Sequence, residues 1–375
     1  MTTFLNLAAW LPAKAQALTI AEAPMPMPGP TEVLIRNRAI ALNPFDHVVQ
    51  TLGSMVTPWL KYPCILGSDA AGDVVTVGKG VTRFKVGDRV AGLALGVDKV
   101  SNRPEEGAFQ HYVVLREDAA TAIPDSMSFE HACVLPLAIA TAACGLFLKD
   151  QLGLEPPTIP ARTRRDSTVV VWGGSTSVGS CAIQLARAAG YDVVATASPR
   201  NFDHVRRLGA SLAFDYRDPQ VVSRMSDALR GQQVLGALAI GSGSGRPCIE
   251  LVRRCGGRKL VSMASAPLPI DDAPLGNQMA WKLATLPRLA LGFAGLALRA
   301  RLRSVTVRSI WGTALVKEDL GRRIFNDFLG PALASGDLVP APEPLVGGHD
   351  LRDIPAAMDI LRKGVSARKV VVSLG

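Results

Sequence analysis

The chain has 375 residues, of which 48% are hydrophobic and 19% are charged, a composition that can bury a sizeable core and excludes intrinsic disorder and fibrous repeats. Aromatic side chains make up 5%, too few for a surface that stacks nucleic-acid bases, and the net charge of +9 is spread without any long basic run. We therefore expect about two globular domains with a solvated basic surface and no nucleic-acid partner.

The first 135 residues have the pattern of an antiparallel β-barrel. Residues 32–42 alternate hydrophobic and polar side chains, as expected of a half-buried strand. Turn signals rich in Gly and Pro recur at residues 24–30, 77–80 and 86–90. Short strands separated by such turns predict a barrel rather than alternating strands and helices.

Residues 168–311 alternate β-branched runs with helical patterns. We expect six strands, at residues 168–172, 192–197, 212–216, 235–240, 258–263 and 304–310. Most connections between them have helical spacing, such as the one over residues 178–189, which ends before Gly190. This alternation predicts an α/β fold with right-handed crossovers and one doubly wound, parallel, six-stranded sheet of the Rossmann type.

The sequence WGGSTSVGS, residues 172–180, lies between the first of these strands and the following helix, where a dinucleotide-binding turn belongs. Gly174 would make the tight turn, Gly179 would let the helix pack closely on the strand, and the first amides of the helix would face a pyrophosphate. Thr176 replaces the middle glycine of the usual pattern, so a turn without any ligand is the alternative. The residues predicted to hold a cofactor here are Gly174, Ser175, Thr176, Ser177, Val178 and Gly179.

The end of the second strand predicts which cofactor binds. NAD-dependent proteins usually have an acidic residue there for the ribose 2′-hydroxyl, whereas residues 196–201 read TASPRN. Ser198 and Asn201 can hydrogen-bond a 2′-phosphate, Arg200 can neutralise its charge, and Tyr216 would lie beside the same pocket. We therefore expect NADPH rather than NADH; the alternative is that Arg200 is an ordinary surface residue of the next helix.

Two further segments after the glycine turn lead to expectations, the end of the fourth strand and residues 266–303. Gly241 and Ser242, after the fourth strand, are expected beside the nicotinamide ribose. Residues 266–303 contain an apolar stretch flanked by Arg288, Arg299, Arg301 and Arg303. This segment is either a mouth for an acyl chain and its anionic carrier, or a helix that covers the sheet and leaves its arginines in solvent.

After Trp311 the pattern changes again. We expect a helix near residues 319–330, a Pro-rich link, a helix over residues 353–364 and a last strand over residues 369–374. This tail is too short to fold alone, so we expect it to complete the barrel. The predicted domains are therefore residues 1–135 with 312–375, and residues 136–311.

The six cysteines form no C-x-x-C pair and match no zinc or disulfide spacing, which favours a reducing compartment. The N-terminus lacks the basic region of a signal peptide, since Lys14 is the first cationic side chain. The best candidate for a membrane span, residues 289–298, is short and bounded by arginines. We therefore expect a cytoplasmic protein without a membrane partner.

Taken together, these motifs resemble the medium-chain dehydrogenase/reductase superfamily. The matching stretches are ALNPFDH (41–47), residues 62–92, EGAFQHYVVL (106–115), LPLAIATAACGLF (135–147) and residues 172–193. Within the superfamily the chain is most similar to the zinc-independent branch of quinone-oxidoreductase-like proteins and of trans-acting enoyl reductases that serve polyketide synthases. The resemblance implies a GroES-like barrel, completed by the C-terminal tail, with the nucleotide in the cleft between the domains.

The chain departs from the alcohol dehydrogenases of this superfamily at their zinc ligands. They have a cysteine after the first barrel strands and a Gly-His-Glu further on, whereas this chain has Phe45 and Asp46 at the first place and Gly-Ser-Asp at residues 67–69. Neither place supplies a thiolate or an imidazole, and residues 65–132 contain no cysteine for a structural zinc. We therefore expect no metal.

The resemblance also suggests catalytic residues. Thr141 is implied as a contact near the nicotinamide or the substrate carbonyl, although it could instead bond to its own helix. Asn43 and Asp46 fall in the family's Asn-Pro-x-Asp turn at the cleft edge, which turn chemistry alone could explain. Related enoyl reductases often have a lysine where this chain has Val48, so His47 is the nearest titratable group and could donate a proton, or could be a plain turn residue.

Without zinc to polarise a carbonyl, the reaction that remains accessible is hydride transfer from NADPH to an activated C=C bond, in an enoyl thioester or an enone. The alternatives are an NADPH:quinone oxidoreductase, and a catalytically silent relative that binds nucleotide or RNA. The expected partners are a small-molecule or carrier-bound enoyl substrate and an acyl carrier or polyketide synthase, and the expected state is a monomer or homodimer.

Overall fold

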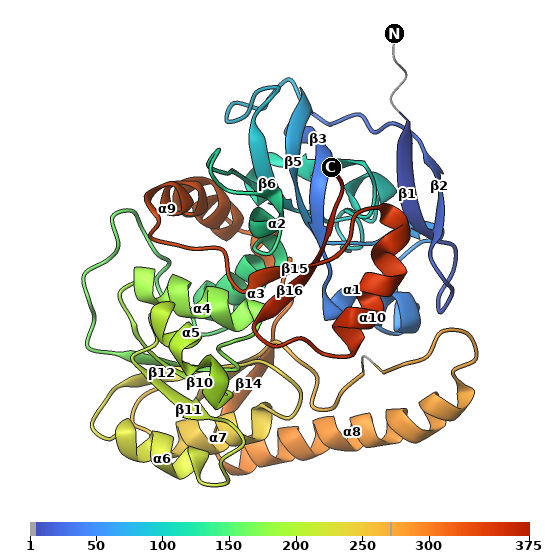
Figure 1. Cartoon of the computed structure of the whole chain (residues 1–375). Coiled ribbons are helices and arrows are strands. Elements are labelled where there is room, and N and C mark those ends of the chain that lie inside the picture. Colours follow the sequence, from blue (N-terminus) through green and yellow to red (C-terminus); the bar gives the residue numbers. More distant parts are fainter. Residues whose placement is uncertain (1–4, 271) are drawn as a thin grey trace.

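The middle of the chain forms an open parallel sheet, as Figure 1 shows for this computed structural model, which describes residues 5–270 and 272–375. The sheet order in this described part is β11-β10-β9-β12-β13-β14, and every neighbouring pair is parallel. The strands are β9 (Thr168–Trp172), β10 (Asp192–Ala197), β11 (Leu212–Asp215), β12 (Val234–Ala239), β13 (Leu260–Met263) and β14 (Thr306–Ser309). The order reverses between β9 and β12, which confirms the predicted Rossmann-type sheet.

Helices cover both faces of this sheet. They are α3 (Pro136–Phe147), α4 (Ser177–Ala188), α5 (Phe202–Arg207), α6 (Val221–Ala228), α7 (Gly245–Arg254) and α8 (Met279–Leu302). The central strand β9 is buried at every position. Val169 and Val171 pack in one core with residues of α3 and α4, while Val170 and Trp172 pack in another with residues of α6 and α7. A strand buried on both faces explains the uninterrupted apolar run TVVVW.

The N-terminal part forms the predicted antiparallel β-barrel. Its strands are β1 (Asn6–Leu11), β2 (Thr19–Ala23), β3 (Glu32–Ala41), β4 (Cys64–Ile65), β5 (Asp69–Val77), β6 (Arg89–Leu93), β7 (Tyr112–Arg116) and β8 (Ala120–Ala122). The helices α1 (Pro44–Leu52) and α2 (Phe129–Ala132) flank it. Two strands from the C-terminal tail, β15 (Glu343–Gly348) and β16 (Arg368–Ser373), extend the same sheet, because β16 pairs antiparallel with β3.

Strand β3 is where the two parts of the molecule share a core. Ala39, Ile40 and Ala41 are all fully buried, so its second half does not show the alternation of a half-buried strand. Ile40 packs inside the barrel, whereas Ala39 and Ala41 belong to the hydrophobic cluster that also contains residues of α3, α4 and β9. The small alanine side chains thereby let the barrel sheet lie against the nucleotide-binding half.

The C-terminal tail also forms helices. The helix predicted at residues 319–330 is a π-helical segment over Arg322–Leu329, followed by α9 (Gly330–Ser335). The helix expected at residues 353–364 is α10 (Ile354–Arg362). Phe325 and Phe328 of the π-helical segment are buried in the shared core, which places this part of the tail between the barrel and α3.

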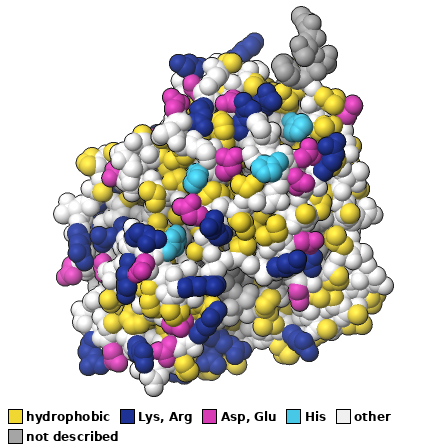
Figure 2. Space-filling model, in the orientation of Figure 1, with side chains coloured by type: hydrophobic (Ala, Val, Ile, Leu, Met, Phe, Trp, Pro, Cys, Tyr) yellow, Lys and Arg dark blue, Asp and Glu magenta, His cyan; other side chains and the backbone are white. Residues whose placement is uncertain are grey.

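Helix α8 contains the apolar stretch of residues 289–298, which the sequence indicated as too short to span a membrane. It is an uninterrupted helix of 24 residues, and it runs along the lower edge of the molecule in Figure 1, past the sheet toward α1 and α10. Two helical stretches are long and apolar enough to cross a membrane by length and composition, Phe129–Phe147, which is 72% buried, and Met279–Leu302, which is 11% buried. The first is a core helix; the second is largely exposed, and yellow and dark blue side chains adjoin along that edge in Figure 2.

Candidate active site

A cavity of about 670 Å³ lies between the carboxyl ends of the parallel strands and the barrel. Its wall combines the turn after β9, the ends of β10, β12 and β13, the start of α1, one side of α3, and the segment from α10 to β16. Open α/β sheets bind ligands at this edge, where the strand order reverses. The cavity is therefore the candidate site.

The glycine turn after β9 lies in the cavity wall, with one correction to the expected roles. Gly173, not Gly174, has the left-handed conformation of the tight turn, with φ of +88°. Gly174 is buried, and a Cβ there would meet Ala195, so it serves packing and does not line the cavity. A Cβ on Gly179 would lie 2.2 Å from the Gly173 carbonyl oxygen, which is the close helix–strand approach expected of this position.

The start of α4 presents donors to the cavity. Thr176 caps the helix: its hydroxyl accepts from the Gly179 amide at 3.0 Å and donates to the Gly173 carbonyl at 2.8 Å, so that hydroxyl is already used. The amides of Ser177 and Val178 are in the first helical turn, where no intrahelical acceptor exists. Ser175, Ser177 and Val178 all line the cavity. Free amides with a positive helix end suit an anionic phosphate group.

The polar residues after β10 lie together at one end of the cavity. Ser198, Arg200, Asn201 and Tyr216 all line it. The Asn201 amide donates to the Ser198 hydroxyl at 3.2 Å and to the Ser366 hydroxyl at 3.1 Å, which fixes its orientation. Arg200 is exposed and makes no ion pair within residues 5–270 and 272–375. The Ser198 hydroxyl and the Arg200 guanidinium remain available as donors, and no carboxylate competes with them in the described lining.

The turn after β12 forms the next part of the wall. Gly241 and Ser242 both line the cavity, and Gly241 has φ of +91°. The Gly241 amide donates to the Ser265 hydroxyl at 2.9 Å, and the Ser244 hydroxyl donates to the Gly241 carbonyl at 2.6 Å. Ser265, which follows β13, thus ties the ends of two strands together.

Every charged residue in the cavity wall is a cation. These residues are Arg200, Arg217, Arg368 and Lys369, and no Asp or Glu belongs to the lining in the part of the chain that the structure describes. Three of the four escaped the sequence analysis, because Arg217 follows β11 and the other two start β16, far along the chain from the glycine turn. A wall with this charge favours a ligand that carries several phosphates.

Lys369 is part of a buried polar cluster under the wall. Its ammonium lies 3.0 Å from Asp69 Oδ2 and also donates to Asn43 Oδ1, while the Asn43 side-chain amide donates to Asp69 Oδ2 at 2.8 Å. The other Asp69 oxygen accepts from the Leu137 amide at the start of α3, at 2.6 Å. Asp69 of β5 therefore connects three other elements through these bonds: β16, the start of α1 and the start of α3. It occupies a position where related dehydrogenases have a metal-binding motif.

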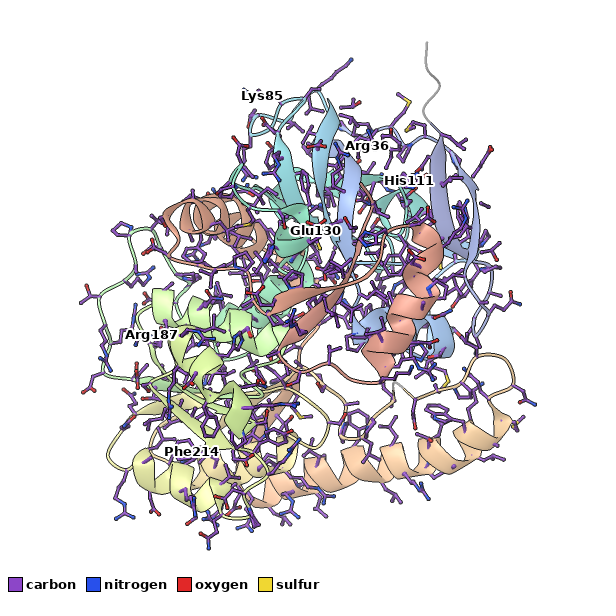
Figure 3. All side chains as sticks on the ribbon, in the orientation of Figure 1. Arg36, Lys85, His111, Glu130, Arg187 and Phe214 are labelled. Atoms are coloured by element: carbon purple, nitrogen blue, oxygen red, sulfur yellow. The ribbon has the colours of Figure 1, made fainter. Side chains whose placement is uncertain are left out.

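The strand that carries Lys369 is held at its other end as well. Ser373 donates to Glu130 of α2 at 2.6 Å, and Figure 3 labels Glu130 beside the C-terminal strands. A lysine at the start of the apolar run KVVVSL is the signal that could have been noticed, because a buried lysine is rarely left without a partner. Its partner Asp69 was not predictable from spacing.

Asn43 reaches the cavity, but Asp46 and His47 do not belong to its lining. Asp46 is buried and accepts from the Asn43 backbone amide at 2.7 Å, which completes a capping box at the start of α1. Burial raises the pKa of Asp46 to about 7; the Asn43 amide opposes this rise, and the negative charge of Asp69 adds to it. His47 is 3% exposed. The structure therefore assigns Asp46 to the turn and removes His47 from the cavity wall.

The remaining wall is apolar around one hydroxyl. Leu42, Phe45, Leu137, Ile240 and Ala264 are among the lining residues, and Thr141 of α3 lies with them. The Thr141 hydroxyl makes no hydrogen bond to the described residues, so it is not bonded back to its helix as the alternative proposed. Behind Phe45 stands Trp311, at 5.6 Å between ring centres, and Trp59 packs on Trp311 at 5.7 Å.

Metal ligands and reactive thiols are lacking around the cavity. Within residues 5–270 and 272–375, no group of three or more His, Cys, Asp or Glu side chains could hold a metal ion. The six cysteines are free and buried, and burial raises the pKa of Cys64 and of Cys144 to about 12. The arginines of residues 266–303 are absent from the lining in the described part of the chain, so this segment is not the mouth of the cavity.

Comparison with known proteins agrees with this geometry. The family model of the alcohol dehydrogenase GroES-like domain matches residues 29–125, and that of the zinc-binding dehydrogenase matches residues 177–277. The dehydrogenase pigH of Monascus ruber is 46% identical over 98% of this chain and 99% of its own length. The trans-enoyl reductase himH of Aspergillus japonicus is 37% identical over 100% of this chain and 99% of its own length.

A solved structure shows the same fold. Mycobacterial Rv1454c complexed with NADPH superposes with a TM-score of 0.68 at 20% identity, over 98% of this chain and 99% of that one. At this identity the likeness concerns the fold alone. The family models and the full-length relatives establish more: the chain belongs to the medium-chain dehydrogenase/reductase superfamily, in the enoyl reductase-like branch, and is an oxidoreductase whose fold binds a nicotinamide cofactor.

Proposed function

We propose that this protein is a zinc-independent, NADPH-dependent reductase of activated C=C bonds, in enoyl thioesters or enones. The observation that supports NADPH as the cofactor is the charge of the cavity wall. Four cations and no carboxylate line the cavity in the part of the chain described here. An acidic residue after β10 would repel a 2′-phosphate, whereas the Ser198 hydroxyl and the Arg200 guanidinium there can donate to it, with Ser198 held in place by Asn201. Trans-enoyl reductases among the full-length relatives support the reaction.

The residues of this chain have separate tasks in that reaction. The amides at the start of α4, together with Arg368, would hold the pyrophosphate, and Arg200 the 2′-phosphate. When bound, NADPH would supply a hydride to the β-carbon of the substrate. Thr141 would donate its unpaired hydroxyl hydrogen to the carbonyl oxygen on which negative charge then accumulates. The apolar wall around Leu137 and Ile240 would hold the acyl part of the substrate.

The α-carbon must then take a proton, which solvent supplies in this proposal. No His, Cys, Asp or Glu belongs to the cavity lining within residues 5–270 and 272–375. Lys369 is buried and donates to Asp69 and Asn43, so its protons have protein acceptors. This assignment replaces the earlier suggestion that His47 donates the proton.

The polarising group is the Thr141 hydroxyl, and no metal takes part. A catalytic zinc needs three protein ligands, and the place of the zinc motif holds Asp69 bound to Lys369, Asn43 and the Leu137 amide. Quinone reduction is the second candidate, because structures of quinone oxidoreductases share the fold. The substrate form in this proposal is a carrier-bound enoyl chain, delivered by an acyl carrier or polyketide synthase; the trans-enoyl reductases among the relatives support the enoyl group.

An assay of NADPH oxidation with three acceptor classes tests this function. We expect turnover with an enoyl thioester or a small enone, and a saturated product by mass spectrometry, in enzyme dialysed against a chelator. Turnover with quinones alone, with hydroquinone as the product, would replace this proposal with the second candidate. NADPH binding without turnover of any acceptor would contradict both.

A further inference from the structure

Helix α8 has an apolar face that no described part of the chain covers. Five large hydrophobic side chains on it are between 58% and 73% exposed: Met279, Leu283, Leu291, Leu298 and Leu302. At 3.6 residues per turn, these positions fall on one side of the helix over its whole length. We call this set the α8 stripe. A patch of this kind on a folded protein marks a surface that something else covers.

The opposite face of α8 is fixed to the protein, so the stripe points outward. Leu296 and Ala300 are buried against the core between α7 and β14. At the other end, Gln278 donates to the Thr51 carbonyl of α1 at 2.7 Å, and Trp281 packs with Val48 and Leu52 of α1. Both ends of the helix are thus anchored. A change in the helix position would not hide the stripe.

The charges of α8 indicate which kind of partner covers the α8 stripe. The helix sequence contains Lys282, Arg288, Arg299 and Arg301 and no acidic residue. Within residues 5–270 and 272–375, none of these four cations makes an ion pair, whereas the neighbouring Arg303 lies 3.7 Å from Glu250. A second copy of the chain on this face would therefore place cations against cations. A surface with negative headgroups over an apolar layer complements both features.

We propose that α8 lies flat on a membrane that contains anionic lipid. The α8 stripe enters the boundary between headgroups and acyl chains, and Arg288, Arg299 and Arg301 extend to the phosphates. The helix does not span the bilayer, because Leu296 and Ala300 are packed against the protein. This proposal is independent of the proposed function, and it replaces the expectation from sequence that no membrane is involved.

The position of α8 relative to the cavity suggests why the protein would attach to a membrane. Ala264 and Ser265 line the cavity, and the residues that follow them, Pro267 and Leu268, lie against Gly292 in the middle of α8. A membrane that holds α8 is thus one short loop away from the apolar wall. This use alone rests on the proposed function: a lipophilic enone or a long acyl chain dissolved in the bilayer would meet the protein close to the cavity.

Vesicle sedimentation tests the proposal directly. The full chain is mixed with vesicles of phosphatidylcholine alone, or of three parts phosphatidylcholine to one part phosphatidylglycerol. We expect the protein to sediment with the second vesicles and to remain in solution with the first. The variant R288Q/R299Q/R301Q is expected to bind the anionic vesicles about a hundredfold more weakly, since each basic residue near such a surface contributes about fivefold.

The stripe is tested with matched variants of equal charge. The variant L283E/L291E/L298E changes three stripe residues, and M27E/V86E/V100E changes three other exposed apolar residues, which lie in the barrel half. Circular dichroism confirms that each variant is folded. The proposal requires that only the first variant loses vesicle binding. Three results would overturn the proposal: the protein sediments with neither kind of vesicle, both variants lose vesicle binding equally, or the protein is a dimer that L283E/L291E/L298E dissociates. The last result would assign the α8 stripe to a second copy of the chain.

Discussion

Lys369 and Asp69 form a fully enclosed ion pair: the ammonium and the carboxylate lie 3.0 Å apart, and their side chains are 4% and 0% exposed. The two residues are 300 positions apart in the chain, on β16 and β5. This pair joins the last strand of the barrel to the floor of the cavity. It also holds Asn43 in place, because both side chains bond to the Asn43 amide group.

Removing one partner of this pair should cost more than removing both. Lys369→Met leaves a buried, unpaired carboxylate, and we expect the free energy of unfolding to fall by about 3–5 kcal/mol. The double variant D69N/K369M removes both charges and should recover part of that loss. Chemical denaturation of the wild type, the single variants D69N and K369M, and the double variant measures this. A double variant that is as unstable as the sum of the two single variants would show that the pair is not coupled.

Arg200 should distinguish the two nicotinamide cofactors. Arg200→Ala removes a charge-assisted bond to a 2′-phosphate, so we expect NADPH affinity to fall by about 1.5–3 kcal/mol and NADH affinity to stay nearly unchanged. Titration calorimetry measures both dissociation constants. Arg230→Ala is the control, because Arg230 is an exposed arginine just after α6 that is paired with Asp227 and lies outside the cavity. Equal losses for both cofactors would contradict the role of Arg200.

Thr141 should affect turnover and not cofactor binding. Thr141→Val keeps the shape and removes the hydroxyl, so we expect kcat to fall about ten- to hundredfold with an unchanged NADPH dissociation constant. Thr141→Ser keeps the hydroxyl and should retain most of the activity. A Cβ on Gly312 would lie 2.5 Å from the Thr141 hydroxyl oxygen, so Gly312→Ala should reproduce the defect. A valine variant with normal kcat would rule out this hydroxyl.

Asp46 should make the stability of the protein decrease as the pH rises. Its pKa in the folded protein is raised to about 7, so the folded state holds the proton more tightly than the unfolded state. The folded state is then favoured most below the ordinary pKa of an aspartate, and this advantage is lost as the pH rises to about 7. Asp46→Asn can still accept from the Asn43 amide and should flatten this slope. Thermal denaturation between pH 4 and 8 measures it; parallel slopes in both proteins would contradict the assignment.

Substitution of Gly173 by alanine should destabilise the protein for two separate reasons. Gly173 has φ of +88°, and an added Cβ would lie 2.9 Å from the Ile240 carbonyl oxygen. Gly231 has a similar φ of +80° with no atom near an added Cβ. Gly231→Ala should therefore cost about 1–2 kcal/mol from backbone strain, and Gly173→Ala clearly more. Equal losses in denaturation experiments would show that the close approach at Gly173 is unimportant.

The nucleotide-binding half could be predicted well because its signals are local. Buried parallel strands are continuous apolar runs, and the turn after β9 lies within nine consecutive residues, WGGSTSVGS. The tight turn was predicted at Gly174 and lies at Gly173, because the letters GG do not show which residue takes the positive φ. The boundaries proposed at residues 135 and 311 stay predictions, since one hydrophobic cluster spans both halves.

The polar floor of the cavity could not be predicted, because its members come from distant parts of the chain. Asp69, Lys369 and Asn43 meet only when β16 adds to the barrel beside β3. The exposure of α8 was equally hidden, since an apolar helix has the same sequence whether a neighbour covers it or not. Local spacing therefore predicts the cofactor turn, and tertiary pairing determines what faces it.

Isotope tracing tests the central claim most directly. NADPH carrying two deuterium atoms at C4 is mixed with the enzyme and an enoyl thioester in ordinary water, and the experiment is repeated with unlabelled NADPH in heavy water. The account predicts that the first product carries deuterium at the β-carbon and the second carries it at the α-carbon. A saturated product without label from C4, or deuterium from heavy water at the β-carbon, would contradict direct reduction of the C=C bond in this cavity.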